Sequence, residues 1–168
     1  MARVYWAKQD VNDDERSLVK TLNFAILYGI GIPGIARKFR KTPAEAGEIR
    51  NRYREAFPIM RAYNQGISNS VKADGYVKSS FGRKRHLEAQ WAYKGVNALV
   101  QGSCSDVMKL CMIDLHKLMS TMKSRILLTI HDELCIEIHK TELELVPEII
   151  KIMTNFPQFK IPLKVDVK

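Results

Sequence analysis

The feature that most restricts the fold is a four-residue spacing of two basic and two aromatic side chains. These side chains are Arg16, Lys20, Phe24 and Tyr28. Because each helical residue turns by about 100°, residues four apart share one slowly turning stripe of an α-helix. Residues 12–15 (Asn-Asp-Asp-Glu) supply capping and acidic groups before the stripe, and residues 29–34 (Gly-Ile-Gly-Ile-Pro-Gly) would end the helix. The pattern predicts a helix over about residues 15–28.

The opposite stripe of this helix is predicted to face the core. Leu18, Leu22 and Ile26 start about 200° away from the polar stripe. The exposed stripe then carries two cations near the positive end of the helix dipole, where a triphosphate can be held. An aromatic side chain two turns further on can meet the sugar or base of the same nucleotide. An ordinary amphipathic helix with solvated charges has the same periodicity, so the spacing alone leaves both interpretations open.

Composition and charge narrow the class of protein. The 168 residues are 46% hydrophobic and 27% charged, which is typical of one globular domain or two small lobes. There is no apolar run of 18 residues and no secretory signal at the start. We therefore expect a soluble, cytoplasmic protein with no membrane partner. Residues 1–90 hold 17 Lys or Arg against 9 Asp or Glu. This excess indicates a lobe that faces a polyanion, although a solvated basic surface would look the same.

The remaining elements give an α+β fold, a mostly helical part followed by a small antiparallel sheet. A capping box at residues 42–45 (Thr-Pro-Ala-Glu) predicts a helix to about Ala56. Further expected elements are a helix at 59–73, a strand-like stretch at 76–81, a long helical region at 89–119 bent at Gly102, a helix at 142–154 and an edge strand at 161–167.

Two apolar, β-branched runs at residues 125–130 and 133–138 are separated only by His131 and Asp132. This pattern predicts a tight β-hairpin with His131, Asp132 and Glu133 at its tip. Carboxylates at a rigid turn provide the hard oxygen ligands that Mg²⁺ needs for phosphoryl transfer. The alternative is a solvated turn in which Asp simply suits the backbone.

The helix and its terminal glycine resemble a known motif. Residues 16–29 are similar to motif B, RxxxKxxxFxxxYG, the O helix in the fingers of family A (bacterial polymerase I-like) DNA polymerases. The resemblance implies that Arg16 and Lys20 contact the incoming triphosphate, and that Lys20 is also catalytic by assisting leaving-group protonation. It further implies that Phe24 packs near the sugar and Tyr28 stacks close to the templating position. Phe rather than Tyr at position 24 implies discrimination against dideoxynucleotides.

The hairpin resembles motif C of the same family. Residues 127–134 contain its HDE sequence, and motifs B and C follow the family's order. The resemblance implies that Asp132 is a catalytic ligand of two Mg²⁺ ions. Glu133 would support the metal site and catalysis less directly, and His131 would lie near the primer terminus.

The connecting sequence agrees with this family. Residues 53–58 and 75–85 resemble fingers segments, and Arg83 and Arg85 of the basic run would contact DNA phosphates, unless the run is a solvated loop. Residues 96–109 resemble the segment N-x(3)-QG-x(3)-D, which implies that Asn97 and Gln101 reach the duplex minor groove near the primer end. Buried amides that cap a bend at Gly102 are the alternative for these two side chains.

The resemblance extends from about residue 16 to residue 167. It implies a fingers part at residues 1–90 and a partial palm at residues 91–168. It also implies a bacterial or phage origin, with an organellar origin left open. Three departures matter: no DxSxxE motif A occurs, the stretch from Arg85 to Asn97 is shorter than usual, and the chain stops soon after residues 165–167, before the family's C-terminal segment.

These features lead to one expected function and one alternative. We expect part of a template-directed DNA polymerase that adds deoxynucleotides to a primer 3′-OH, with primer-template DNA, dNTP and Mg²⁺ as partners. Without motif A and the thumb of a parent protein, this chain is expected to be inactive alone. The alternative is a non-catalytic nucleic-acid-binding remnant. A structural protein with unrelated chemistry would require every motif match to be accidental.

Overall fold

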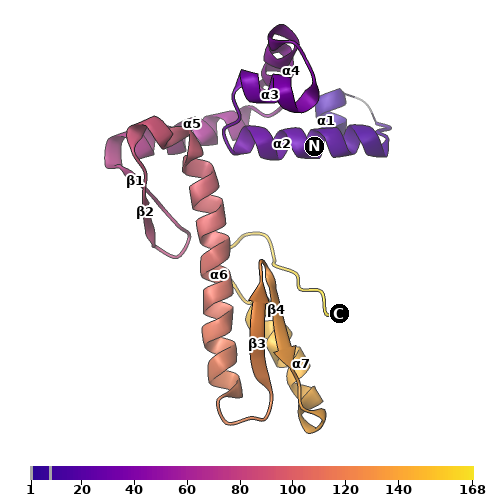
Figure 1. Ribbon diagram of the computed structural model, residues 1–168, viewed down its shortest axis with the longest axis vertical. Coiled ribbons are helices and arrows are strands. Elements are labelled where there is room, and N and C mark those ends of the chain that lie inside the picture. Colours follow the sequence, from indigo (N-terminus) through magenta and orange to yellow (C-terminus); the bar gives the residue numbers. More distant parts are fainter. Residues whose placement is uncertain (1, 8) are drawn as a thin grey trace. The chain divides into compact units, whose positions relative to one another are not determined.

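The computed structural model describes residues 2–7 and 9–168, and the chain folds as two compact units, Met1–Gly102 and Ser103–Lys168. The first unit contains α1 (Ala2–Trp6), α2 (Asp13–Leu27), α3 (Ile32–Phe39), α4 (Pro43–Ala56), α5 (Pro58–Asp74), β1 (Tyr76–Lys78), β2 (Lys84–His86), the 3₁₀ helix η1 (Ala89–Lys94) and the start of α6 (Gly95–Met119) (Figure 1). The second contains the rest of α6, β3 (Arg125–Ile130), β4 (Glu133–Glu137), the 3₁₀ helix η2 (Lys140–Leu145) and α7 (Val146–Thr154). Helices with two small antiparallel sheets confirm the predicted α+β class.

Helix α2 confirms the prediction made from its caps. The Asn12 side chain accepts a hydrogen bond from the Glu15 amide at 2.8 Å, and the Glu15 carboxylate accepts one from the Asn12 amide at 3.1 Å. This reciprocal cap starts the helix at Asp13. The buried stripe runs through Val19 and Leu22 rather than through Leu18, which is 39% exposed. The expectation that Leu18 faces the core is therefore wrong.

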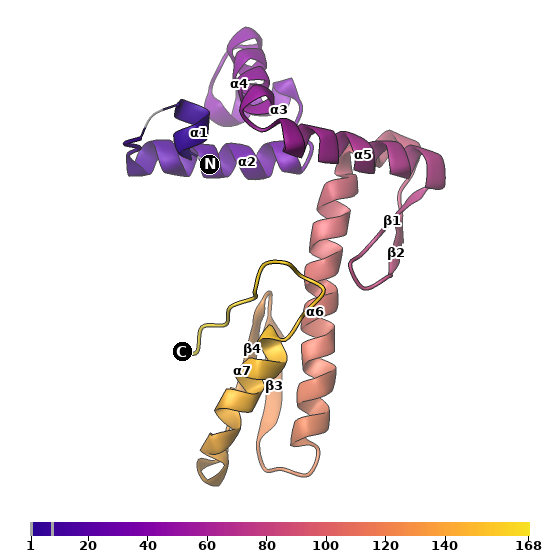
Figure 2. The same cartoon turned by 180° about the vertical axis from the view of Figure 1, so that it is seen from behind.

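The core of this region joins three helices. Val19 and Leu22 of α2 pack with Tyr5 of α1 and Tyr53 of α4. Figure 2 shows the short helix α1 next to α2, with α3 and α4 close by. Helix α3 was not predicted, because the sequence Gly-Ile-Gly-Ile-Pro-Gly indicated only a break. The break is shorter than expected, since Gly31 serves as the N-cap of α3 and Pro33 fits its first turn, where no backbone donor is needed.

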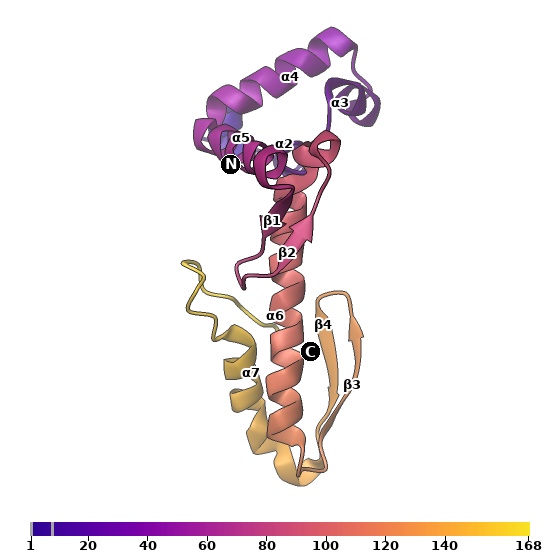
Figure 3. The same cartoon turned by 90° about the vertical axis from the view of Figure 1, so that its left-hand side faces the viewer.

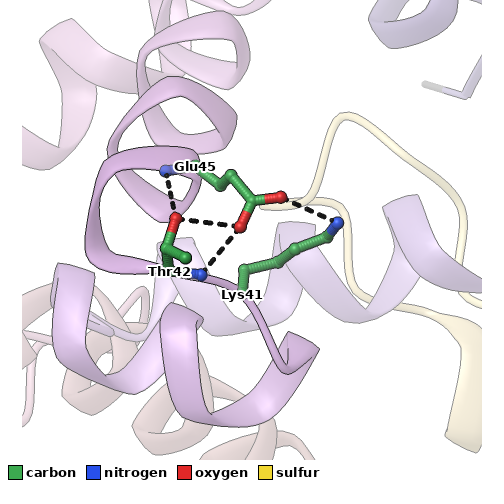
Figure 4. A network of polar contacts seen from close by, with 3 residues as sticks. All are labelled: Lys41, Thr42 and Glu45. Atoms are coloured by element: carbon green, nitrogen blue, oxygen red, sulfur yellow. Dashed lines mark hydrogen bonds and ion pairs between the residues drawn. The ribbon is translucent and has the colours of Figure 1, made fainter.

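Helix α4 begins at the predicted capping box (Figure 4). The Thr42 hydroxyl accepts from the Glu45 amide at 3.3 Å, and the Glu45 carboxylate accepts from the Thr42 amide at 2.8 Å. Lys41 completes the network with an ammonium 3.0 Å from the same carboxylate. The Thr42 amide, then the Lys41 and Thr42 side chains, lower the pKa of Glu45 to about 2.

A separate core supports the short hairpin β1–β2. It contains Val71, Val77, Ala92 and Ala98. Only one strand-like stretch was predicted here, whereas β1 pairs with a second strand formed by the basic residues Lys84–His86. Apolar alternation could not have indicated β2, since its residues are Lys, Arg and His, and all three are exposed. Backbone pairing with β1, and not burial of side chains, defines this strand.

The long helical region differs from the prediction in two ways. Its first part is the 3₁₀ helix η1, and α6 then runs without interruption through Gly102, where a bend was expected. A single glycine weakens a helix interior by only about 1 kcal/mol, which packing at both ends can offset. The two units meet in the sequence directly after Gly102.

The second unit packs α6, the hairpin and α7 around Leu115, Met119 and Ile149 (Figure 3). The predicted hairpin is confirmed, with Ile130 opposite Glu133 and a register shift between Ile126 and Leu128. The last α-helix starts later than predicted, at Val146, and η2 precedes it.

The edge strand predicted at residues 161–167 is wrong. These residues form neither helix nor strand, and within the described residues β3 and β4 pair only with each other. Apolar alternation leads to a strand only where a neighbouring backbone supplies hydrogen bonds. Among the described residues, no strand pairs with this segment. Across residues 2–7 and 9–168, no helix has both the length and the apolar character that crossing a bilayer requires.

Candidate nucleotide and metal sites

The predicted stripe of α2 lies on the surface of the first unit. Arg16, Lys20 and Phe24 are exposed, and Tyr28, the cap residue of the helix, is half-buried. The rings of Phe24 and Tyr28 are neighbours, with centroids 6.1 Å apart and planes tilted by 33°. In the described part of the chain, no carboxylate forms a salt bridge with Arg16 or Lys20. Both cations therefore remain available to an anionic ligand.

An open pocket of about 570 Å³ lies against this stripe. Its lining residues are Ala2, Arg3, Val11, Arg16, Val19, Lys20, Asn23 and Phe24. Three are cations, one is aromatic and none is a carboxylate, so the hollow is strongly attractive to a polyanion with a planar group. Its volume is in the range of small-ligand sites.

Arg3 is the cation of this pocket that the sequence did not reveal. It reaches the pocket because α1 is held against the first turn of α2: Tyr5 is buried in the core, and the Trp6 indole N–H donates to the Glu15 carbonyl at 3.4 Å. The Arg52 guanidinium lies over the Tyr5 and Trp6 rings at 5.3 and 5.4 Å and secures them further. Only tertiary packing, which no spacing encodes, brings Arg3 to the site.

Asn23 is the second pocket residue that the sequence did not reveal. Its side-chain oxygen accepts a hydrogen bond from the Tyr53 hydroxyl. Burial raises the pKa of Tyr53, so this hydroxyl stays protonated and remains a donor at neutral pH. The contact fixes the amide so that its nitrogen remains a donor beside Lys20 and Phe24.

The acidic tip lies in the second unit and is built differently. His131, Asp132 and Glu133 are all exposed, and His131 adopts a left-handed backbone with φ of 54°. The Lys168 ammonium lies 2.9 Å from the Glu133 carboxylate, and this hydrogen bond raises the pKa of Lys168. The Asp132 carboxylate has no such partner among the described residues.

The tip fits Mg²⁺ as part of a site. Asp132 and Glu133 offer carboxylate oxygens, and Mg²⁺ commonly uses one or two carboxylates together with waters and substrate phosphates. Within residues 2–7 and 9–168, no three or more His, Cys, Asp or Glu side chains come together to form a complete metal site. Any further ligand would have to come from water, from substrate or from another segment.

The four expected DNA contacts on the first unit lie on β2, on α6 and just before β2. Asn97 is half-buried, and its side-chain oxygen is buried without a hydrogen-bond partner, whereas Gln101 one turn later is exposed. The Arg83 guanidinium donates to the Gly102 carbonyl at 3.1 Å. Arg85 lies in β2 opposite Val77 and is exposed. The alternative for Asn97 and Gln101 was that they are buried amides that cap a bend at Gly102. In the described structure α6 continues through Gly102 and neither amide caps it, so this alternative is not supported.

Comparison with known proteins shows the family of the chain. The sequence model of DNA polymerase family A matches residues 2–168. Among curated relatives, the chain is 36% identical over 172 residues to DNA polymerase I of Caldicellulosiruptor bescii, and 35% identical over 176 residues to that of Geobacillus stearothermophilus. Each match covers 95% of this chain but 20% of the relative, so the chain spans about a fifth of the length of these proteins.

A solved structure supports the same relationship. It is described as the POL domain of Pol1 from M. smegmatis in complex with DNA primer-template and dNTP. The two folds superpose with a TM-score of 0.86 and 28% sequence identity, over 97% of this chain and 31% of the other. The match over residues 2–168 and this shared fold show that the chain belongs to DNA polymerase family A.

Proposed function

We propose that this chain binds a deoxynucleoside triphosphate in the α2 pocket and takes part in template-directed addition of nucleotides to a primer 3′-OH. The observation that carries the proposal is the pocket itself, in which three cations and an aromatic ring surround one hollow that has no carboxylate in its lining. The family, and a relative described in complex with primer-template and dNTP, support the same ligand.

The roles within the pocket follow from its chemistry. Arg16 lies near the N-terminal, positive end of α2, and Lys20 lies one turn later at the middle of the helix. Both bind the phosphates with charge-assisted hydrogen bonds. Lys20 also acts as a catalytic acid by donating a proton to the leaving pyrophosphate. Phe24 packs near the sugar, and Tyr28, whose ring lies beside that of Phe24, stacks close to the templating position.

At the hairpin tip, Asp132 and Glu133 would hold Mg²⁺, with Asp132 as the primary ligand. When bound, two such ions lower the pKa of the primer 3′-OH and neutralise charge on the leaving group. A second aspartate is needed to hold both ions, and this sequence contains no DxSxxE motif that would supply it. The chain alone is therefore inactive, and a complementary segment that carries motif A restores the reaction.

The remaining polar residues would hold the DNA. Asn97 and Gln101, one helical turn apart on α6, donate to the minor-groove acceptors that all correct base pairs share. His131 lies near the primer terminus. Arg83 and Arg85, the two arginines of the basic run around β2, bind phosphates. In this scheme residues 1–90 act as fingers and residues 91–168 as part of the palm.

Primer extension tests the proposal. The chain is assayed with Mg²⁺, dNTP and primer-template, alone and with a family A segment that contains motif A and the thumb. We expect extension only in the combined sample, and a Lys20→Ala chain should lose most of it. Lys38→Ala is the matched control, since Lys38 is exposed on α3 and does not line the pocket. Near-normal extension by Lys20→Ala would refute the assigned role.

A second candidate is a nucleic-acid-binding protein without catalysis. It is favoured by the ion pair between Glu133 and Lys168, which occupies one of the two tip carboxylates. This alternative predicts DNA binding without extension, even when the complementary segment and Mg²⁺ are both present.

A further inference from the structure

The 3₁₀ helix η1 has one side fixed in the core. Residues three apart in a 3₁₀ helix lie above one another, so Ala92 and the following Gly95 face the same way. Ala92 is buried with Val71 and Val77. A Cβ atom at Gly95 would lie only 2.8 Å from the Ile67 side chain, so the backbone there is in close contact with α5. This side fixes the direction of the other side chains of η1.

The opposite sides of η1 present a cluster of two aromatic rings and a cation. We call Trp91, Tyr93 and Lys94 the η1 platform. Trp91 is 41% exposed and Tyr93 is 47% exposed, and their ring centroids are 6.0 Å apart with planes tilted by 51°. The Lys94 ammonium lies 3.9 Å from the centre of the Trp91 ring and forms no salt bridge with any described carboxylate. Large rings that the fold leaves this exposed are available to a flat ligand.

The η1 platform adjoins the end of α2. At Gly29 a Cβ atom would lie 2.5 Å from a ring carbon of Tyr93 and 2.8 Å from its backbone oxygen. Gly29 also has φ of 82°, so glycine alone permits both the turn and this approach. Gly29 directly follows Tyr28, and Tyr28 neighbours Phe24 of the pocket. The aromatic residues thus continue from the pocket, along α2, to η1.

From this arrangement we infer that the η1 platform stacks the unpaired nucleotides of the template strand next to the templating position. The inference rests on the proposed function and adds a surface for the single-stranded part of the template. Bases in a duplex have no free π-face, whereas unpaired bases can stack on Trp91 and Tyr93. Lys94 is released from the Trp91 ring when a base takes its place and then pairs with a phosphate. No group of the platform needs to read a base edge, so binding is tolerant of sequence.

Binding of two DNA duplexes tests the inference. One is a primer-template with a 5′ template overhang, and the other has the same duplex with blunt ends. Stacking on aromatic side chains is worth enough per base to expect overhang binding roughly 5- to 100-fold tighter, measured by fluorescence anisotropy. Trp91→Leu and Tyr93→Leu should remove most of this preference, and Trp91→Phe should keep much of it. Tyr63→Leu is the matched control, because Tyr63 is 46% exposed on α5 and is not part of the η1 platform.

Further readouts separate the possible outcomes. In a Trp6→Phe background the remaining tryptophan is Trp91, so oligo-dT should quench its fluorescence. Thermal unfolding followed by circular dichroism verifies that the variants are folded. Equal affinity of the unmodified chain for overhang and blunt DNA overturns the inference but leaves the proposed function intact. A preference for overhang DNA that survives both Leu variants has the same two consequences. Absence of binding to either DNA defeats both.

Discussion

The α2 pocket and the hairpin tip, the two sites of the proposed reaction, are encoded by the sequence in different ways. The pocket draws most of its groups from one helix, so helical periodicity alone places Arg16, Lys20 and Phe24 around it. The tip offers two adjacent carboxylates in solvent, one of them paired with Lys168. The pocket is therefore formed by neighbouring helices of one unit, whereas the proposed metal site would need ligands beyond those that the described residues bring together at the tip.

The largest expected effect comes from core truncation in each unit. Leu22 and Leu115 are both fully buried, so Leu22→Ala and Leu115→Ala should each cost about 2–5 kcal/mol of unfolding free energy. Leu22 packs with Val19, which lines the pocket, so only Leu22→Ala should also abolish dNTP binding at temperatures near its own unfolding midpoint. Thermal melts with and without dNTP measure this. Loss of dNTP binding in Leu115→Ala, at a temperature where the first unit stays folded, would show that the pocket depends on the second unit.

The next largest effect is expected at Gly29. Gly29→Ala places a methyl group against Tyr93 and forces a positive φ, which costs about 1–2 kcal/mol before any steric clash is added. The substitution should lower the Tm and weaken the preference for overhang DNA. Gly66→Ala is the control, because a Cβ atom there meets nothing within 4 Å and the helix should gain slightly. Equal Tm values for the two variants would contradict the close contact between Gly29 and Tyr93.

Acid should weaken the first unit through the cap of α4. The folded pKa of Glu45, about 2, lies below its ordinary value of 4.5. This group therefore stabilises the fold above about pH 4.5, and its contribution is lost as the pH falls toward 2. Thr42→Ala should cost about 1 kcal/mol at neutral pH and reduce the acid sensitivity between these pH values. Urea unfolding at pH 7 and pH 3 measures this sensitivity. If the unfolding free energy falls by the same amount in Thr42→Ala as in the unmodified chain, the network does not stabilise the fold.

The second unit has its own acid-sensitive carboxylate. Glu142 accepts hydrogen bonds from the Ser124 hydroxyl at 2.5 Å and from the Lys123 amide at 3.1 Å, and these contacts lower its pKa. Glu142→Gln should therefore flatten the part of the acid response that belongs to this unit. The Glu45 network should be unaffected, so the Thr42→Ala/Glu142→Gln double variant should show the sum of the two single effects on acid sensitivity. Urea unfolding at pH 7 and pH 3 measures these effects.

The smallest effect is expected at the hairpin tip. Lys168 and Glu133 are both exposed, so Lys168→Ala should leave the Tm unchanged within error. It should free the carboxylate and raise Mn²⁺ affinity of the tip by about twofold or less, measured by titration. Lys164→Ala is the control, because it removes a charge four residues earlier in the sequence that forms no described ion pair. A large drop in stability would show that the ion pair is structural.

What could be predicted from the sequence was mostly local. The capping residues Asn12 and Thr42 marked two helix starts, and the His131-Asp132 pair marked a hairpin turn. Each of these signals acts within a few residues, so the chain shows it directly.

The parts that could not be predicted depend on contacts between distant residues. Strand β2 forms because β1 lies beside it. Residues 161–167 are irregular because no described strand pairs with them. Arg3 joins the pocket through the packing of α1. The 3₁₀ turns of η1 follow from the close contact of Ala92 and Gly95 with the core, which overrides the α-helical pattern expected there.

The affinities of dATP, dAMP and deoxyadenosine for the chain test most directly whether α2 holds a triphosphate. If the cations of α2 hold the triphosphate, dATP should bind at least roughly tenfold tighter than the nucleoside, because hydrogen bonds to charged groups dominate the difference. Arg16→Ala and Lys20→Ala should each remove most of that advantage while nucleoside binding stays the same, and Lys38→Ala should change neither. Equal affinities for dATP and deoxyadenosine, or an advantage that survives both substitutions, would contradict the account.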